Sequence, residues 1–150
     1  MKVKDILATK KRRGQILRVQ VVDQVAQAVQ IMVEHDTGSV AVYEDDSFIG
    51  MLTFREVLIA IHKEGFASAE KIACGDVVER GGHCTTPEDS VDQIRNIMTS
   101  QHVRYLPVVQ DGHLTDVISF YDVARSVAKA VDFENRMLKE YISDWPTDRE

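Results

Sequence analysis

The chain has 150 residues, 44% of them hydrophobic, and a formal net charge of −6. This length suits one compact domain with its own core. No apolar run reaches the ~18 residues of a membrane helix, and the charged N-terminus lacks an apolar signal core, so we expect a cytoplasmic protein without membrane contact. The acidic balance disfavours general affinity for nucleic acid, and two cysteines are too few for a disulfide scaffold.

The chain begins with a short mixed segment, residues 1–7, that resembles residues 73–78. A basic run follows, Lys10-Lys11-Arg12-Arg13-Gly14, and is predicted to be a loop. Such runs are usually solvated, which is the simpler interpretation. The alternative is that these cations lie over a first ligand site and meet phosphates, because guanidinium groups match phosphate geometry.

The next stretch predicts a strand at residues 16–22, a helix at 24–35, strands at 38–43 and 48–52, and a second helix. We expect Asp23 and Thr53 to cap the two helices. The first helix should bury one apolar face, made of Val25, Ala28, Val29, Met32 and Val33. The second should point Val57, Leu58 and Ile61 inward, with His62 as a further candidate.

After a connector at residues 65–71, the chain re-enters the fold at 71–78 and turns at Gly81-Gly82. A helix capped by Asp89 or Ser90 should run to residue 101. Residues 102–123 then predict two strands joined by Asp111-Gly112, a strong signal for a tight antiparallel hairpin.

The second strand ends at Ser119, with Asp122 three residues later. This spacing predicts a helix N-terminus at which a hydroxyl and a carboxylate lie beside free backbone N–H groups. The same pattern occurs 66 residues earlier, where Thr53 and Glu56 correspond to Ser119 and Asp122. Two copies of one unit therefore account for most of the chain.

The remaining C-terminal part predicts a long amphipathic helix that Pro146 ends. Its apolar residues at helical spacing are Val127, Val131, Leu138, Tyr141, Ile142 and Trp145. Two arrangements remain open. The helix packs on its own repeat, or it crosses to a second subunit, where aromatic residues tend to anchor contacts.

The β-α-β-β-α order, the strand with Leu106-Pro107-Val108 and the twice-occurring hydrophobic-hydrophobic-Ser/Thr-x-x-acid junction resemble a tandem pair of cystathionine-β-synthase (CBS) domains, a Bateman module. The resemblance covers about residues 1–130. It implies an α+β fold of two repeats about a pseudo-twofold axis, residues 1–66 and 67–130, followed by a helical tail at 131–150. It also implies two clefts between the repeats and a homodimer.

Members of this family bind adenosine compounds in those clefts without doing chemistry on them. The resemblance thus implies a regulatory module that is not an enzyme, holds no catalytic cofactor or metal, and signals to an unknown protein partner. AMP is the first expected ligand, with ATP, NADH and S-adenosylmethionine as others. The residues expected at the site of the second copy are Thr85, Thr86, His102, Arg104, Tyr105, Leu106, Pro107, Ser119 and Asp122. Those expected at the first, weaker site are Val19, Gly38, Ser39, Val40, Thr53 and Glu56.

Within these sets, Asp122 is expected to accept bonds from the ribose hydroxyls and Ser119 to meet a phosphate. The strand from Arg104 to Pro107 would face the adenine, with Thr85 or Thr86 closing the other side and Arg104 or His102 adding a phosphate contact. The first site is expected to be weaker because Glu56 is one methylene longer than the family's aspartate. In the second copy Asp116 replaces a common glycine, and it either repels a phosphate or points outward.

Three other interpretations are open. One is a structural dimer module with degenerate clefts. Another is a Ser119, Asp122 and histidine triad, which lacks the Gly-x-Ser-x-Gly elbow of such enzymes. The last is a metal site at Cys74, His83 and Cys84, whose spacing does not fit common zinc motifs.

Overall fold

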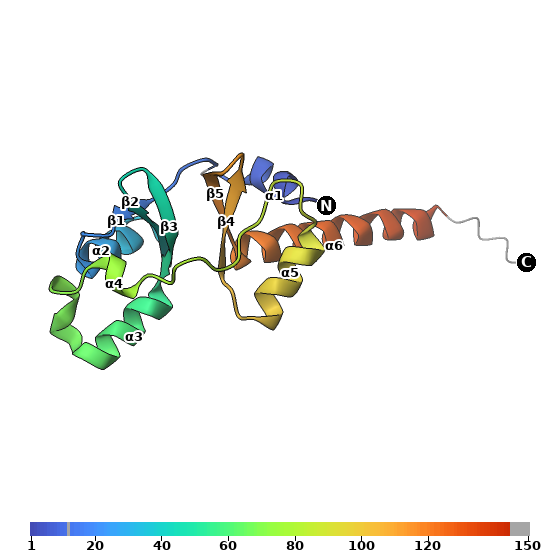
Figure 1. Cartoon of the computed structure of the whole chain (residues 1–150). Coiled ribbons are helices and arrows are strands. Elements are labelled where there is room, and N and C mark those ends of the chain that lie inside the picture. Colours follow the sequence, from blue (N-terminus) through green and yellow to red (C-terminus); the bar gives the residue numbers. More distant parts are fainter. Residues whose placement is uncertain (12, 145–150) are drawn as a thin grey trace, which may run out of the picture.

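The computed structural model describes residues 1–11 and 13–144, and the chain adopts an α+β fold made of two halves. Each half holds one small β-sheet. The two sheets lie beside each other in the middle of the molecule, with the helices outside them (Figure 1). They meet where β3 (Ser47–Thr53) contacts β4 (Tyr105–Gln110). The α+β class predicted from the sequence is confirmed.

The sheet of the first half has the strand order β1-β2-β3. In it β1 (Arg18–Gln20) runs parallel to β2 (Ser39–Glu44), which pairs antiparallel with β3. The helices of this half are α2 (Val25–Glu34), α3 (Phe54–Glu64) and the short 3-10 helix η1 (Phe66–Glu70). They enclose a core that includes Val19, Val25, Ala28, Val42, Leu52 and Val57.

In the second half β4 pairs antiparallel with β5 (His113–Ser119). The hairpin turn has positive φ at both central residues, 51° at Asp111 and 77° at Gly112, as a tight turn of this kind requires. Before helix α5 (Val91–Ser100), at the place of β1 in the first half, the chain forms one parallel bridge between Thr85 and Val108. That bridge is the counterpart of the pairing of Val19 with Val42 in the first half.

Two short helices cross between the halves. Helix α1 (Val3–Thr9) precedes the first repeat in the chain, yet Val3, Ile6 and Leu7 are buried in the core of the second half with Ile94 and Ile118. Helix α4 (Cys74–Val77) instead buries Cys74 in the core of the first half. The backbone N–H of Val3 donates to Asp89 O at 2.9 Å, and that of Cys74 donates to Asp23 O at 2.7 Å. Each core therefore includes a short helix that precedes the other repeat in the sequence.

The caps of the first helices differ partly from expectation. Asp23 does not cap α2, whose N-cap is Gln24. The Asp23 carboxylate instead accepts the backbone N–H of Gln20 at 2.8 Å and tightens the turn after β1. Its counterpart Asp89 accepts from Thr86 N–H at 2.9 Å, so Ser90 is the cap of α5.

Some predicted core residues lie at the surface. Val33 is 76% exposed and Leu58 is 60% exposed, and His62 is exposed as well. The buried face of α3 is narrow. It consists of Val57 and Ala60, and the partly buried Ile61 packs against the same core. Because neighbouring helix positions are about 100° apart, Leu58 and His62 are turned away from that stripe.

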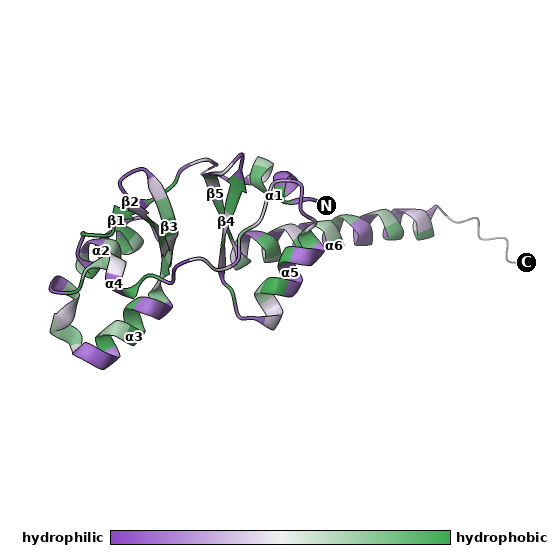
Figure 2. Cartoon of the chain, in the orientation of Figure 1, coloured by the Kyte–Doolittle hydropathy of each residue, from purple (hydrophilic) through white to green (hydrophobic). Residues whose placement is uncertain are grey.

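Helix α6 (Phe120–Ser143) has 24 residues, whereas its counterpart in the first half, α3, has 11. Val123 is buried and Val127 packs against the second core, so the first two turns lie on their own repeat. The rest extends away from both halves (Figure 1), with apolar and polar residues alternating along it (Figure 2). Trp145 and Pro146 lie outside the described residues. Among those described, none of the helices combines the length and apolar character needed to cross a bilayer.

The two cysteines are expected to differ sharply in reactivity. Burial raises the pKa of the Cys74 thiol to about 11, and the nearby Asp23 adds to the effect. Cys84 is exposed. Because the thiolate is the reactive form, a thiol reagent at pH 8 should modify one cysteine per native chain, and none in a Cys84→Ser variant, until denaturant is added. Labelling of Cys74 at a similar rate in the native protein would contradict the burial described above.

Candidate functional site

Two cavities lie between the repeats, and each one combines residues of both copies. The first, here called the Ser119 cavity, has a volume of about 660 Å³. It places Val117, Ser119, Phe120, Tyr121 and Asp122 of the second copy opposite Leu17, Thr37, Ser39 and Val40 of the first. Ser119 and Asp122, at the start of helix α6, therefore face a wall that the other repeat supplies.

The second cavity, here called the Thr53 cavity, has a volume of about 850 Å³. It places Met51, Thr53, Phe54, Arg55 and Glu56 of the first copy opposite Gly81, Gly82, His83, Gln101, His102 and Val103. His83 and Gln101 are hydrogen-bonded to each other through their side chains. The two cavities are thus counterparts whose linings exchange the roles of the copies.

At the corner of the Ser119 cavity, Ser119 and Asp122 form a reciprocal capping box. The backbone N–H of Ser119 donates to Asp122 Oδ2 at 2.9 Å, and the N–H of Asp122 donates to Ser119 Oγ at 3.0 Å. The other carboxylate oxygen, Oδ1, lies 3.9 Å from Arg125 Nη2. Ser119 Oγ is held as an acceptor, so its own O–H remains able to donate. This corner therefore offers both a hydroxyl donor and a carboxylate acceptor.

The corner of the Thr53 cavity is chemically different. Glu56 Oε2 accepts the backbone N–H of Thr53 at 2.9 Å and also accepts the Thr53 hydroxyl. The additional methylene of Glu56 lets its carboxylate curl back onto the hydroxyl three residues earlier. The Thr53 hydroxyl proton is therefore already bound within the chain, unlike that of Ser119.

Arg104 and Tyr105 line both cavities. The Tyr105 hydroxyl accepts the backbone N–H of Gly38 at 3.0 Å, which ties β4 to the first half. A Cβ at position 38 would overlap this hydroxyl and lie 2.7 Å from the Phe54 ring, so a larger residue there would have to displace these side chains. The Arg104 guanidinium lies 5.3 Å from the centre of the Phe54 ring. The cation expected at the second site is thus shared between the two cavities.

The structure regroups the residues predicted for the second site. Arg104, Tyr105, Ser119 and Asp122 line the Ser119 cavity, but His102 and Pro107 line only the Thr53 cavity. Leu106 is fully buried in the core. Thr85 and Thr86 line neither cavity.

Thr85 is 1% exposed, and hydrogen bonds from the Thr86 N–H and the Thr85 hydroxyl lower the pKa of Asp89. These two threonines thus hold the turn before α5. They do not close a wall of either cavity.

The residues predicted for the first site are divided in the same way. Thr53 and Glu56 line the Thr53 cavity, but Ser39 and Val40 line the Ser119 cavity. Val19 is 2% exposed and belongs to the core. Gly38 lines an apolar groove between α2 and α3 rather than either cavity. The two predicted groups do not coincide with the two cavity linings, because each cavity draws its two walls from different copies.

Of the linkers that precede each repeat, the sequence pointed only to the basic run at Lys10–Gly14, as one of two alternatives, and Gln15 and Glu79 were missed. Lys10 and Gln15 line the Ser119 cavity, and Glu79 lines the Thr53 cavity. Gly50 lies against the second linker so closely that a Cβ there would overlap the carbonyl oxygen of Glu79. The offset of 66 residues, which relates Gln15 to Gly81, could have pointed to the two missed residues.

The comparisons with known proteins agree with this architecture. The sequence pattern described as CBS domain matches residues 3–63 and 74–129. The chain belongs to the CBS-domain family. It is 30% identical over 125 residues to the mitochondrial CBS domain-containing protein CBSX3 of Arabidopsis thaliana, which covers 80% of this chain and 60% of that protein. This CBS-domain chain thus spans less than two thirds of that relative.

Solved structures of CBS-domain proteins superpose closely. A CBS-domain containing protein from Agrobacterium tumefaciens gives a TM-score of 0.78 at 26% identity, covering 84% of this chain and 98% of the other. The CBS domain pair of protein MJ0100, in complex with 5′-methylthioadenosine and S-adenosylmethionine, gives 0.73 at 17% identity over 87% and 98% of the two chains. CBSX2 in complex with AMP gives 0.68 at 16% identity over 86% and 97%. The last two share the fold with this chain and bind adenosine compounds.

Proposed function

We propose that this CBS pair is a regulatory module that binds an adenosine nucleotide, does no chemistry on it, and reports its binding to a protein partner. The observation that carries the proposal is the mixed lining of each cavity. A ligand held there contacts both repeats, so it favours the relative packing of the repeats for which it has the higher affinity. The adenosine ligands of MJ0100 and CBSX2 support the choice of ligand class.

We propose AMP as the first ligand of the Ser119 cavity, with ATP, NADH and S-adenosylmethionine as others. Asp122 Oδ1 would accept from the ribose, and the Ser119 hydroxyl would donate to a phosphate. In the Thr53 cavity the Thr53 hydroxyl already donates to Glu56, so binding a phosphate would break that contact. The Ser119 cavity should therefore bind a nucleotide more tightly than the Thr53 cavity.

A thermal-shift panel tests this function with AMP, ATP, NADH and S-adenosylmethionine. A ligand at ~100 times its Kd should add about 2.7 kcal/mol to the free energy of unfolding. We expect AMP to stabilise the wild type, and Asp122→Asn to weaken AMP binding about tenfold through loss of a charged acceptor. The matched control is Glu56→Gln, which should leave AMP binding nearly unchanged.

Two outcomes would count against the proposal. If none of the four compounds shifts the transition, the chain is better described as a structural or interaction module with degenerate clefts. The occupied Thr53 hydroxyl already favours that description for one cavity. If Glu56→Gln abolishes AMP binding while Asp122→Asn does not, the order of the two cavities is reversed.

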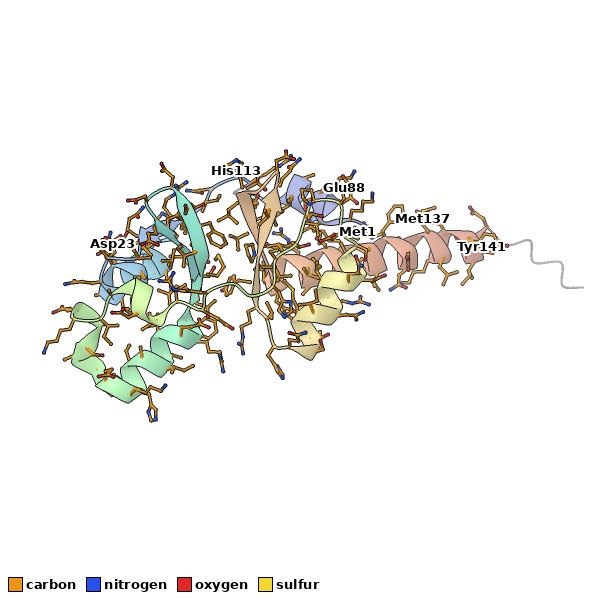
Figure 3. All side chains as sticks on the ribbon, in the orientation of Figure 1. Met1, Asp23, Glu88, His113, Met137 and Tyr141 are labelled. Atoms are coloured by element: carbon orange, nitrogen blue, oxygen red, sulfur yellow. The ribbon has the colours of Figure 1, made fainter. Side chains whose placement is uncertain are left out.

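We also propose a homodimer, in the cytoplasm, as the working form. The support for the dimer is the exposed apolar surface of α6, where Val131, Phe133, Met137, Leu138, Tyr141 and Ile142 are each about half exposed or more. Figure 3 shows Met137 and Tyr141 on the part of this helix that extends beyond both halves. The support for the location is composition alone, and fractionation of cells that express the protein would check it.

A further inference from the structure

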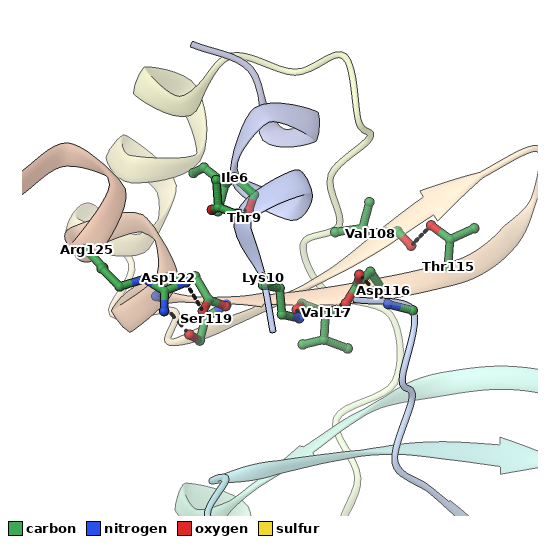
Figure 4. A network of polar contacts seen from close by, with 11 residues as sticks. Ile6, Thr9, Lys10, Val108, Thr115, Asp116, Val117, Ser119, Asp122 and Arg125 are labelled. Atoms are coloured by element: carbon green, nitrogen blue, oxygen red, sulfur yellow. Dashed lines mark hydrogen bonds and ion pairs between the residues drawn. The ribbon is translucent and has the colours of Figure 1, made fainter. Parts of the chain in front are cut away.

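One cation of the basic run is fixed at the Ser119 cavity. Lys10 follows the last turn of α1, which is anchored in the second core through Ile6 and Leu7. Its ammonium group donates to Asp116 Oδ1 at 2.7 Å and to the carbonyl oxygen of Val117 (Figure 4). The Lys10 side chain is only 15% exposed, whereas its neighbour Lys11 is exposed. Lys10 is thus held in one place, unlike a solvated surface lysine.

Asp116 is the anchor of this arrangement. Its side chain is 3% exposed, and Oδ1 accepts from Lys10 and from the backbone N–H of Val117 at 2.8 Å. Oδ2 accepts the backbone N–H of Gly14 at 2.9 Å. Both oxygens therefore bind the first linker, through Lys10 and Gly14, and hold it against β5. The carboxylate does not point outward. Because Lys10 compensates its charge, Asp116 does not by itself prevent a phosphate from binding in the cavity.

Among the residues that the structure describes, the Thr53 cavity has no counterpart of this pair. The first linker is longer, because Val19 lies 17 positions after Lys2, whereas Thr85 lies 12 positions after the equivalent Ala73. Lys10 to Gly14 fall in that longer linker. The position equivalent to Asp116 is Gly50, which lies against the backbone of Glu79. The ion pair of Lys10 and Asp116 thus distinguishes the Ser119 cavity from the Thr53 cavity.

We propose that Lys10 is a phosphate-binding residue of the Ser119 cavity and makes that cavity select phosphorylated adenosine over adenosine itself. This inference rests on the proposed function. An ammonium group has three N–H donors, and Asp116 and Val117 use two of them. The third is available to a phosphate that also accepts from the Ser119 hydroxyl, since Lys10 and Ser119 line the same cavity.

Asp116 has a second role in this arrangement, because its charge weakens the pull of Lys10 on an anion. Around the cavity, Lys10 and Arg104 lie with the carboxylates Asp36 and Asp122, besides Asp116. These two cations and three carboxylates sum to a formal charge of −1 before binding. Removing the charge of Asp116 should leave Lys10 free to attract a phosphate more strongly.

The test measures the Kd of AMP and of adenosine by calorimetry on the full chain. Lys10→Met should weaken AMP binding about tenfold and change adenosine binding less than twofold. Asp116→Asn should tighten AMP binding several-fold, again without an effect on adenosine. The matched control is Lys11→Met, which should change neither Kd.

Lys10→Met leaves the Asp116 charge buried without its cation, so this variant could fail to fold. The double variant Lys10→Met with Asp116→Asn removes both charges and should show the same selective loss of AMP binding. Equal losses for AMP and adenosine in Lys10→Met and in the double variant would overturn the assignment of Lys10. Weaker AMP binding in Asp116→Asn would overturn the second role of Asp116. A wild type that binds neither compound would instead overturn the proposed function and this inference with it.

Discussion

Replacing either Leu52 or Ile118 with alanine is expected to lower the free energy of unfolding of the whole chain by about 2–5 kcal/mol. The two residues are counterparts at the offset of 66, and each is fully buried, Leu52 in the first core and Ile118 in the second. Truncation removes apolar contacts and leaves a cavity that the surrounding strands and helices fill only in part.

We expect both variants to unfold in a single transition, because α1 completes the second core and α4 the first. Loss of one core therefore releases a segment that belongs to the other half. Urea titrations followed by circular dichroism, with calorimetry beside them, would measure the change and its cooperativity. Leu58→Ala is the matched control, and at 60% exposure it should cost less than about 0.5 kcal/mol.

A two-step transition, with each variant shifting only one step, would show that the halves unfold independently. That result would also weaken the proposed signalling. Ligand binding can change the relation between two halves only if they are coupled, and the crossed helices are the coupling that the structure shows.

The local features of this fold were predictable from sequence because they depend on residues close together in the chain. Asp111-Gly112 predicts the hairpin since the turn needs positive φ at these two positions. The pairs Thr53 with Glu56 and Ser119 with Asp122 predict helix starts, and both are capping boxes. Because the same helix start occurs twice at an offset of 66 residues, these local predictions also led to the CBS-domain family.

The non-local features were not predictable from pattern alone. Nothing in residues 1–7 indicates that α1 completes the second core rather than the first, because an apolar face fits either. Thr85 resembles a cavity residue, yet its backbone pairs with β4 and its hydroxyl donates to Asp89. The orientation of Asp116 depends on Lys10, which lies 106 residues away. The cavities are assembled from such long-range pairs, so their linings had to come from the structure.

Placing an aspartate at Leu138 or Tyr141 is expected to convert the proposed dimer to a monomer. On the part of α6 beyond Ala130, Val131, Phe133, Met137 and Leu138 are each about half exposed or more, and an isolated helix of about 13 residues is marginal in water. Val127, Val131, Leu138 and Tyr141 are spaced by four, seven and three residues, which fits a seam that packs against another helix with the polar Glu134 at its one intervening position. We therefore assign this surface to the same helix of a second copy.

Each buried leucine or tyrosine in such a seam contributes about 1.5–3 kcal/mol, and a carboxylate there would also lose its hydration. Light scattering should give twice the chain mass of 16.9 kDa for the wild type and the single mass for Leu138→Asp. Lys139→Glu changes a neighbouring exposed residue outside the seam and should remain dimeric. Both cavities lie within one chain, so the monomeric variant should still bind AMP. An unchanged dimer in Leu138→Asp and Tyr141→Asp would exclude α6 as the interface.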